Sequence, residues 1–325
     1  MKSLHDSHFD TVDVVSSRLA DVDYICTREL ATAVYLAFNL EKPILVEGPA
    51  GVGKTELAKS MATILDVPLI RLQCYEGLDE SKALYEWKYG KQLLYTQLLK
   101  DKLAEMMQGA VGLAASIERL HGHDDLFFSE HFLEPRPLYQ ALHQERGCVL
   151  LIDEVDKSDP EFEAFLLEVL SDFQVSVPEL GTIVAKVKPL VFLTSNNTRE
   201  MSDALKRRCL HLHIPFPVAK VERTILERRV PGLSQTLNRE LVAFVQAVRA
   251  IDLKKQPSVS ETIDWAKTLL LLNAEHLSLD LVRDTLNVFL KFEQDIASAT
   301  EQLPALLAQA RKDAELPLSS HASHA

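Results

Sequence analysis

Residues 48–55 read Gly48-Pro49-Ala50-Gly51-Val52-Gly53-Lys54-Thr55 and match the pattern G-x-x-x-x-G-K-[ST]. Glycines in such a loop let the backbone fold into a concave nest whose N–H groups point at phosphate oxygens. In this pattern Lys54 would hold the β- and γ-phosphates, and the Thr55 hydroxyl would take a Mg²⁺ position. The loop therefore predicts an ATP site formed by Pro49, Ala50, Gly51, Val52, Gly53, Lys54, Thr55 and Glu56.

The segments on both sides of this loop have the character that phosphate binding requires. Residues 44–46 are a short, apolar, β-branched run that predicts a buried strand. Residues 55–65 carry apolar side chains at helical spacing, and a helix there would turn its positive N-terminus toward the anion. The alternative, a chance match in a glycine-rich turn, would need neither flanking element.

Short strands and helices alternate over the first two thirds of the chain. Further strands are predicted at 69–73, 149–153, 190–194 and 211–214, with a hairpin that pairs 174–177 with 182–185. This alternation is typical of the α/β class, with a parallel five-stranded sheet covered by helices. After Pro217 the apolar pattern is helical only, at 241–251, 262–272, 279–296 and 303–310.

These patterns predict two domains and a tail. Residues 1–218 would form the nucleotide-binding core, with a mostly helical and irregular insert at about 75–143. Residues 219–312 would form a small all-helical lid domain, and residues 313–325 a disordered tail.

Two carboxylates, Asp153 and Glu154, end the apolar run Leu150-Leu151-Ile152. Asp153 is placed to hold Mg²⁺ through water, as the second acidic part of a phosphate-loop site. Glu154 is a candidate base that could polarise an attacking water. The alternative is a pair of solvent-facing acids at the end of a strand.

The composition limits the classes of function. The 325 residues carry 47 acidic and 35 basic groups, a formal net charge of −12, which disfavours a protein that coats nucleic acid. No apolar run reaches the ~20 residues that span a bilayer, and the N-terminus lacks the apolar stretch of a signal peptide. We expect a soluble, cytoplasmic protein.

Taken together, the phosphate loop, Asp153-Glu154, the hairpin and Leu193-Thr194-Ser195-Asn196-Asn197 resemble an AAA+ ATPase of the MoxR group. Residues 46–58 and Leu205-Lys206-Arg207-Arg208-Cys209 are similar to the CoxD-type branch, which is linked to maturation of carbon monoxide dehydrogenase. The resemblance covers roughly residues 25–310.

This resemblance implies roles for further residues. Asn197 aligns with the sensor-1 position, which helps to orient the lytic water, and Asn196 is the second choice. Arg208, with Arg207 beside it, falls where the family places an arginine finger that reaches into the neighbouring subunit. The alternatives are a turn-forming Asn pair and an exposed basic helix end.

One segment departs from the family pattern. Ser260 stands where many members have a sensor-2 arginine, and Ser258 and Glu261 instead form a capping-box pattern. Direct contact between the lid and the γ-phosphate is therefore in doubt, with Lys267 as a weak substitute.

The resemblance implies a Mg²⁺-dependent ATPase that assembles with itself into a ring, a hexamer, and remodels a client protein. The client would be a metalloenzyme that needs maturation, and the helper a protein with a von Willebrand A-type domain. Two other functions stay open: a nucleic-acid motor, disfavoured by the acidic composition, and a nucleotide-binding scaffold with little turnover, suggested by Ser260.

Other possible sites have simpler explanations. His211 and His213 alternate on a predicted strand, and residues 121–125 hold two His and two Asp side chains, but a strand edge and a solvated loop account for them. The Met residues at 106–107 are expected to pack. The four cysteines show no close pair and no setting for a reactive thiol.

Overall fold

The computed structural model describes Leu4 and residues 9–98, 132–177 and 181–315. The predictions for the loop at 121–125, the Met residues at 106–107, the hairpin turn at 178–180 and most of the tail lie outside the described residues. Among the described residues, no helix combines the length and the apolar character needed to cross a bilayer.

A five-stranded parallel sheet forms the centre of the molecule, with the strand order β2-β5-β8-β1-β9. The predicted strands are confirmed to within one residue at each end, as is the parallel α/β class. The strands are β1 (Ile44–Glu47), β2 (Leu69–Gln73), β5 (Val149–Asp153), β8 (Leu190–Ser195) and β9 (Leu210–His213).

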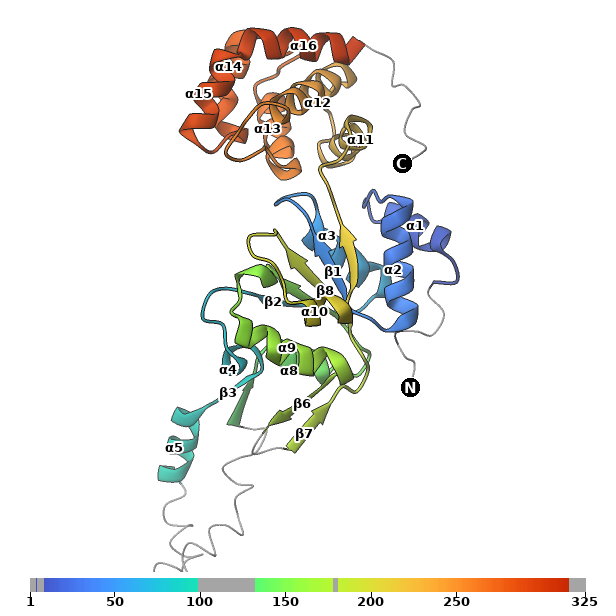
Figure 1. Cartoon of the computed structure of the whole chain (residues 1–325), viewed down its shortest axis with the longest axis vertical. Coiled ribbons are helices and arrows are strands. Elements are labelled where there is room, and N and C mark those ends of the chain that lie inside the picture. The colour runs from blue at the N-terminus through green and yellow to red at the C-terminus, as the bar shows by residue number, and fades with distance from the viewer. Residues whose placement is uncertain (1–3, 5–8, 99–131, 178–180, 316–325) are drawn as a thin grey trace, which may run out of the picture.

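Helices cover both faces of this sheet (Figure 1). Side chains alternate between the faces, so that Val149 and Leu151 of β5 belong to one apolar cluster and Leu150 and Ile152 to the other. The cluster of Val149 and Leu151 packs with α1 (Val12–Asp21), α2 (Arg28–Leu40) and α3 (Lys54–Leu65). The opposite cluster packs with α8 (Pro137–Leu142), α9 (Pro160–Asp172) and α10 (Asp203–Arg208).

The acidic, mixed composition of the first thirty residues does not predict α1. The helix forms because Thr11 caps its first turn, accepting a hydrogen bond from Val14 N at 3.3 Å. Val15 and Leu19, one turn apart, are fully buried against the core.

The segment between β2 and β5 is not simply helical. After α4 (Glu80–Ala83), strand β3 (Tyr85–Trp87) pairs antiparallel with β4 (Leu133–Pro135), so the prediction of a helical, irregular insert is wrong for these two strands. Helix α5 (Tyr89–Leu98) follows β3 and projects away from the sheet (Figure 1). The predicted hairpin is confirmed as β6 (Gln174–Val177) and β7 (Gly181–Val184).

Between β9 and residue 315 the structure describes six helices. The prediction of one helix over 279–296 is wrong, because Leu290 adopts an extended backbone and is buried, and Lys291 Nζ donates to two carbonyls of the preceding turn. The helices are α11 (Ala219–Arg229), α12 (Gln235–Arg249), α13 (Val259–Leu271), α14 (Leu279–Phe289), α15 (Glu293–Glu301) and α16 (Leu303–Glu315).

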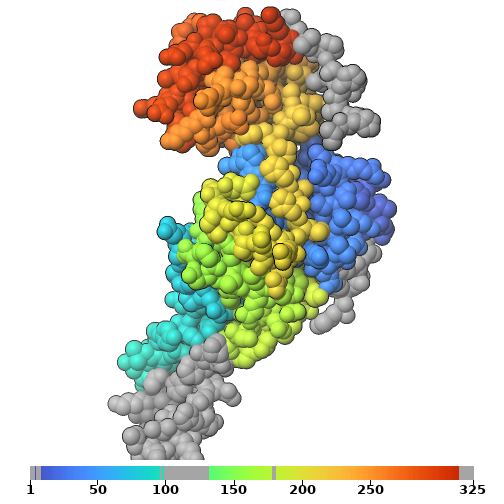
Figure 2. Space-filling view, in the orientation of Figure 1, coloured from blue at the N-terminus to red at the C-terminus, as the bar shows by residue number. Residues whose placement is uncertain are grey.

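These helices have an apolar core of their own, whose buried members lie between Leu226 and Ala310. Trp265 stacks on Phe289 with ring centroids 4.3 Å apart, and its indole N–H donates to Thr285 at 2.8 Å. Figure 2 shows the helices standing above the sheet and joined to it by a narrower neck. The exact domain boundaries stay a prediction.

Candidate functional site

The phosphate loop joins β1 to α3 at the carboxyl edge of the sheet. Gly48, Gly51 and Gly53 have φ values of +150°, +73° and +100°. A Cβ on Gly48 would lie 2.1 Å from the carbonyl oxygen of Ile214, and one on Gly51 would lie 2.6 Å from the Ser258 side chain. Both glycines are therefore required by backbone conformation and by close neighbours.

Lys54 is buried at the start of α3, with 6% of its surface exposed. Its Nζ donates to the carbonyl oxygens of Gly48 and Pro49, at 2.6 and 2.7 Å, and to Asn196 Oδ1 at 2.7 Å. Burial lowers the pKa of Lys54, and the charges of Asp156, Asp153 and Glu154 oppose that shift. The ammonium group is held beside the loop by acceptors that a phosphate could replace.

Thr55 and Asp153 come together as the sequence predicts. The Thr55 hydroxyl donates to Asp153 Oδ1 at 3.2 Å, and Thr194 Oγ1 donates to the same oxygen at 2.5 Å. A hydroxyl and a carboxylate are hard oxygen donors, which suit Mg²⁺ bound through a few protein groups, substrate phosphates and water. The donor set therefore fits a magnesium ion.

Glu154 follows β5 with a left-handed backbone, φ +57°, and its N–H donates to Thr194 Oγ1 at 2.9 Å. Its carboxylate accepts three side-chain hydrogen bonds, from Gln73 at 2.8 Å, Lys157 at 2.7 Å and Asn196 at 3.2 Å. The structure thus places Glu154 in contact with a polar network beside Asp153.

The side chains of the two asparagines after β8 have different partners. Asn196 bridges Lys54 and Glu154 through its side-chain amide. Asn197, the first choice from the sequence, has φ +58°, and its Oδ1 accepts from Ser195 Oγ at 3.4 Å. The structure therefore joins Asn196, the second choice, to the lysine and the carboxylate.

Asp156 is a buried acid that the sequence reasoning missed. Its Oδ2 accepts from Asn196 N at 3.2 Å, Thr198 N at 3.0 Å and Thr198 Oγ1 at 2.6 Å. Burial alone would raise the pKa of Asp156, but the hydrogen bonds from Thr198 and Asn196 hold it below the ordinary value of 3.8. Asp156 thus fixes the loop that carries Asn196.

We expect Asp156→Asn to lower the free energy of unfolding by about 2 kcal/mol near neutral pH, because charge-assisted hydrogen bonds are lost. A lowered pKa stabilises the fold above the ordinary value of 3.8, and this contribution disappears as pH falls through the lower folded-state pKa. The gap in Tm between wild type and variant should therefore narrow below pH 3.8. A gap that is constant down to acid pH would contradict this.

The structure does not bring Arg207 and Arg208 to these groups within one chain. Both are exposed in the last turn of α10. The Arg208 Nε donates to Ser171 Oγ on α9 at 2.6 Å. Their guanidinium groups thus face outward from the chain.

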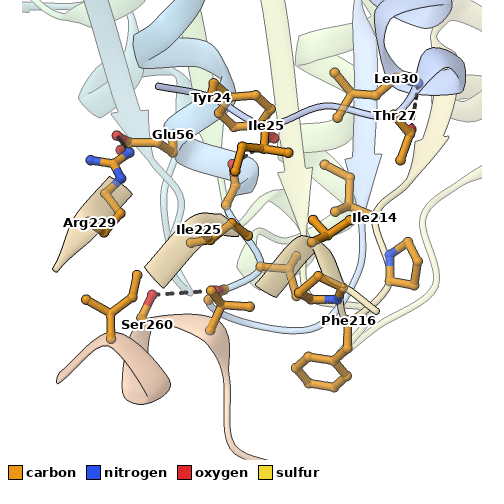
Figure 3. A pocket seen from close by; sticks show the side chains of 18 of the residues that line it. Tyr24, Ile25, Thr27, Leu30, Glu56, Ile214, Phe216, Ile225, Arg229 and Ser260 are labelled. Atoms are coloured by element: carbon orange, nitrogen blue, oxygen red, sulfur yellow. Dashed lines mark hydrogen bonds and ion pairs between the residues drawn. The ribbon is translucent and has the colours of Figure 1, made fainter. Parts of the chain in front are cut away.

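A cavity of about 610 Å³ lies between the phosphate loop and the C-terminal helices (Figure 3). Its lining includes Gly51, Gly53 and Tyr24, whose hydroxyl donates to Gly53 O at 3.5 Å. Arg229 of α11 and Glu56 of α3 pair across it at 2.6 Å. The apolar side chains of Ile25, Ile214 and Ile225 line the same cavity, as Figure 3 shows. Such a lining suits the flat aromatic base of a nucleotide.

The first turn of α13 lies on the phosphate loop. The predicted capping box is confirmed, since Ser258 accepts from Glu261 N and Glu261 accepts from Ser258 N. The Ser260 hydroxyl donates to Gly51 O at 3.5 Å. Two cations of the C-terminal helices, Arg229 and Lys267, line the cavity.

The weaker candidates have structural partners. His211 Nε2 pairs with Glu47, and His213 lines the cavity. Across the described ranges no three His, Cys, Asp or Glu side chains gather into a metal-binding group. Burial raises the pKa of the Cys74, Cys148 and Cys209 thiols to about 12, so these three remain protonated at neutral pH.

Further contacts to the two carboxylates come from residues that the motifs do not name. Arg71 of β2 donates to Asp153 Oδ2 through Nε at 3.0 Å and Nη2 at 2.5 Å. Gln73 and Lys157 contact Glu154. The available signal was the charged residue within the otherwise apolar run Leu69-Ile70-Arg71-Leu72.

Comparison with known proteins identifies the family of the part of the chain that carries these groups. Residues 43–209 match the family model of the AAA domain, dynein-related subfamily. Uncharacterized proteins of Staphylococcus are similar: one from S. epidermidis is 24% identical over 231 residues, 69% of this chain and 74% of its own. One from S. aureus is 23% identical over 240 residues, 72% of this chain and 77% of its own.

Solved structures of RuvB from Thermotoga maritima also superpose on the chain. A point mutant has a TM-score of 0.45 and 18% identity, over 98% of this chain and 88% of that one. The RuvB Holliday junction branch migration motor has a TM-score of 0.44 and 18% identity, over 89% and 81% of the two chains.

The matched family model spans the phosphate loop, Asp153, Glu154 and Arg208, and it covers more than half of the chain. It is broader than the MoxR group, so the MoxR and CoxD assignments stay predictions. AAA domains in general bind and hydrolyse nucleotides, usually with Mg²⁺. The chain belongs to the AAA domain family, in its dynein-related subfamily.

Proposed function

We propose that this protein is a Mg²⁺-dependent ATP hydrolase that works as a ring and remodels a client protein. The observation that supports hydrolysis best is the meeting of Lys54, Asp153, Glu154 and Asn196 at the ends of β1, β5 and β8. A site built only to hold nucleotide would need the lysine and the metal ligand, but not a second carboxylate joined to an amide.

Each residue has a distinct task in this proposal. The amides of the phosphate loop and Lys54 bind the phosphates, and Lys54 exchanges its carbonyl acceptors for phosphate oxygens. Thr55 and Asp153 would hold Mg²⁺, which supplies charge neutralisation at the β- and γ-phosphates. Glu154 accepts a proton from the attacking water, and Asn196, which already contacts Glu154, orients that water.

The cavity beside the loop is the proposed seat of the adenine and ribose. Tyr24 and Ile25 precede α2, and Ile214 directly follows β9. Ile225 comes from α11, and Val259, Ser260 and Ile263 come from α13. A bound nucleotide would therefore contact both parts of the chain. Arg229 and Lys267 are the candidates for a lid cation in place of the arginine that position 260 lacks.

The arginine finger is proposed to come from a neighbouring subunit. Arg208 and Arg207 are exposed, and Arg208 contacts Ser171 on α9, which leaves both guanidinium groups accessible to a neighbouring subunit. In a closed ring every subunit makes the same head-to-tail interface with its neighbour, so each nucleotide site would receive one arginine from the next subunit. We propose a hexamer.

The client and the helper are proposed from the resemblance to the MoxR group. The client would be a metalloenzyme that needs activation or cofactor insertion, and the helper a von Willebrand A-domain protein. Movement of the C-terminal helices against the sheet during each cycle would supply the mechanical work.

Binding of Mg-ATP can be tested by thermal stabilisation. Ligand at a hundredfold excess over Kd stabilises a protein by about 2.7 kcal/mol, which gives a clear rise in Tm. We expect that rise for the wild type and for Lys312→Ala, an exposed lysine on α16, and its loss for Lys54→Ala. No rise for the wild type at millimolar Mg-ATP would refute the proposal.

A further inference from the structure

Arg71 is a charged residue of the site that the proposed hydrolysis does not use. It lies on β2 between the buried Ile70 and Leu72, and about half of its side chain is exposed. Its guanidinium contacts Asp153 Oδ2 twice, at 3.0 Å through Nε and 2.5 Å through Nη2. Its Nη2 also lies 2.5 Å from Gln73 Oε1.

The two oxygens of Asp153 have different partners. Oδ1 accepts from the hydroxyls of Thr194 and Thr55, and Thr55 also belongs to the proposed metal site. Oδ2 accepts mainly from Arg71, with Thr55 farther away at 3.4 Å. A divalent cation and a guanidinium compete for the same carboxylate, because both are held by its charge and lone pairs.

Arg71 also connects the two acids of the site. Gln73 accepts from Arg71 through Oε1 and donates to Glu154 Oε2 at 2.8 Å through Nε2. A continuous chain of hydrogen bonds therefore runs from Asp153 through Arg71 and Gln73 to Glu154. A change of partner at Asp153 is therefore transmitted through Arg71 to Gln73, the residue that contacts Glu154.

We propose that Arg71 is a positioning residue that competes with the divalent cation for Asp153 and, through Gln73, makes the position of Glu154 depend on that exchange. With Arg71 on Asp153, Gln73 and Lys157 hold the Glu154 carboxylate. When Arg71 leaves Asp153, Gln73 loses the partner of its Oε1, and Glu154 becomes freer to contact water. This inference rests on the proposed function, because it needs a nucleotide and a metal at this site.

The test is the Mg²⁺ dependence of nucleotide binding, which needs no turnover. A fluorescent N-methylanthraniloyl derivative of ATP is held at a fixed concentration while free Mg²⁺ is titrated. Asp153 is buried but the Arg71 guanidinium is half-exposed, so solvent screening limits the pair to about 1 kcal/mol, and Arg71→Gln should lower the half-saturating Mg²⁺ concentration by about fivefold. Arg283→Gln, which breaks a surface pair with Asp280, should leave it unchanged.

Arg71→Lys separates the hydrogen-bonded fork from charge alone. Lysine keeps the positive charge but lacks the planar fork through which Arg71 contacts Asp153 by both Nε and Nη2. We expect a smaller fall in half-saturating Mg²⁺ for this variant. An unchanged or raised value in Arg71→Gln would overturn the competition, and wild-type behaviour in Arg71→Lys would overturn the role of the hydrogen-bonded fork.

Gln73→Leu tests the link to Glu154. This change removes the hydrogen bond between Arg71 and Gln73 and should also lower the half-saturating Mg²⁺ concentration. An unchanged value would show that Asp153 and Glu154 are not coupled. If the wild type binds no fluorescent nucleotide at any Mg²⁺ concentration, it is the proposed function that fails. If it binds and Arg71→Gln does not shift the titration, the inference alone fails.

Discussion

Glu154→Gln should bind Mg-ATP nearly as well as the wild type and hydrolyse it roughly 10²- to 10⁴-fold more slowly, the usual contribution of a general base. The amide is similar in size to the carboxylate and can still accept from Lys157 and Gln73, so the surrounding contacts largely persist. It cannot accept a proton from water. The measurement is a phosphate-release assay for kcat together with a binding titration for Kd.

Glu161→Gln is the matched control, since Glu161 is an exposed acid in the first turn of α9. Its kcat should equal that of the wild type. A wild type that binds Mg-ATP without measurable turnover would favour the low-turnover scaffold instead. Full activity in Glu154→Gln would remove Glu154 from the mechanism.

Arg208→Ala should reduce kcat by roughly 10³- to 10⁵-fold, because an arginine finger stabilises the charge that develops in the transition state. That factor corresponds to about 4 to 7 kcal/mol of barrier. Binding of Mg-ATP to an isolated subunit should be unaffected, since Arg208 contacts Ser171 and not the phosphate loop of its own chain. Steady-state kinetics with a parallel Kd measurement test this.

Two further variants make the Arg208 result specific. Ser171→Ala removes the partner of Arg208 within the chain but keeps the guanidinium, so it should remain active. Arg207→Ala decides between the neighbouring arginines. If it abolishes turnover while Arg208→Ala does not, Arg207 is the finger.

The sheet and the phosphate loop were predictable because their signals are local. Strands β1, β5 and β8 are short apolar runs that end at polar residues, and the loop is defined by residue spacing. Elements that depend on distant partners were not predictable: β3 is paired with β4 through Trp87 and Leu133, 46 positions apart. The break at Leu290 was hidden because a buried leucine continues the helical apolar pattern.

Lys54, Asp153 and Glu154 were predictable by motif, but most of their contacts were not. Adjacent asparagines look alike in a sequence, and the positive φ of Asn197 sends its side chain to Ser195 while Asn196 meets Lys54. Asp156 and Arg71 belong to no motif. Their importance comes from the parallel strands that place β2 beside β5 and β5 beside β8.

Mixing Glu154→Gln with Arg208→Ala tests most directly whether each active site is shared between two subunits. Each variant alone should be almost inactive. In mixed rings an Arg208→Ala subunit retains Glu154 and can receive Arg208 from a Glu154→Gln neighbour, so about a quarter of the sites become complete at equal proportions. The account predicts recovery of ATPase activity toward that fraction; a mixture no more active than the sum of its two parts would contradict it.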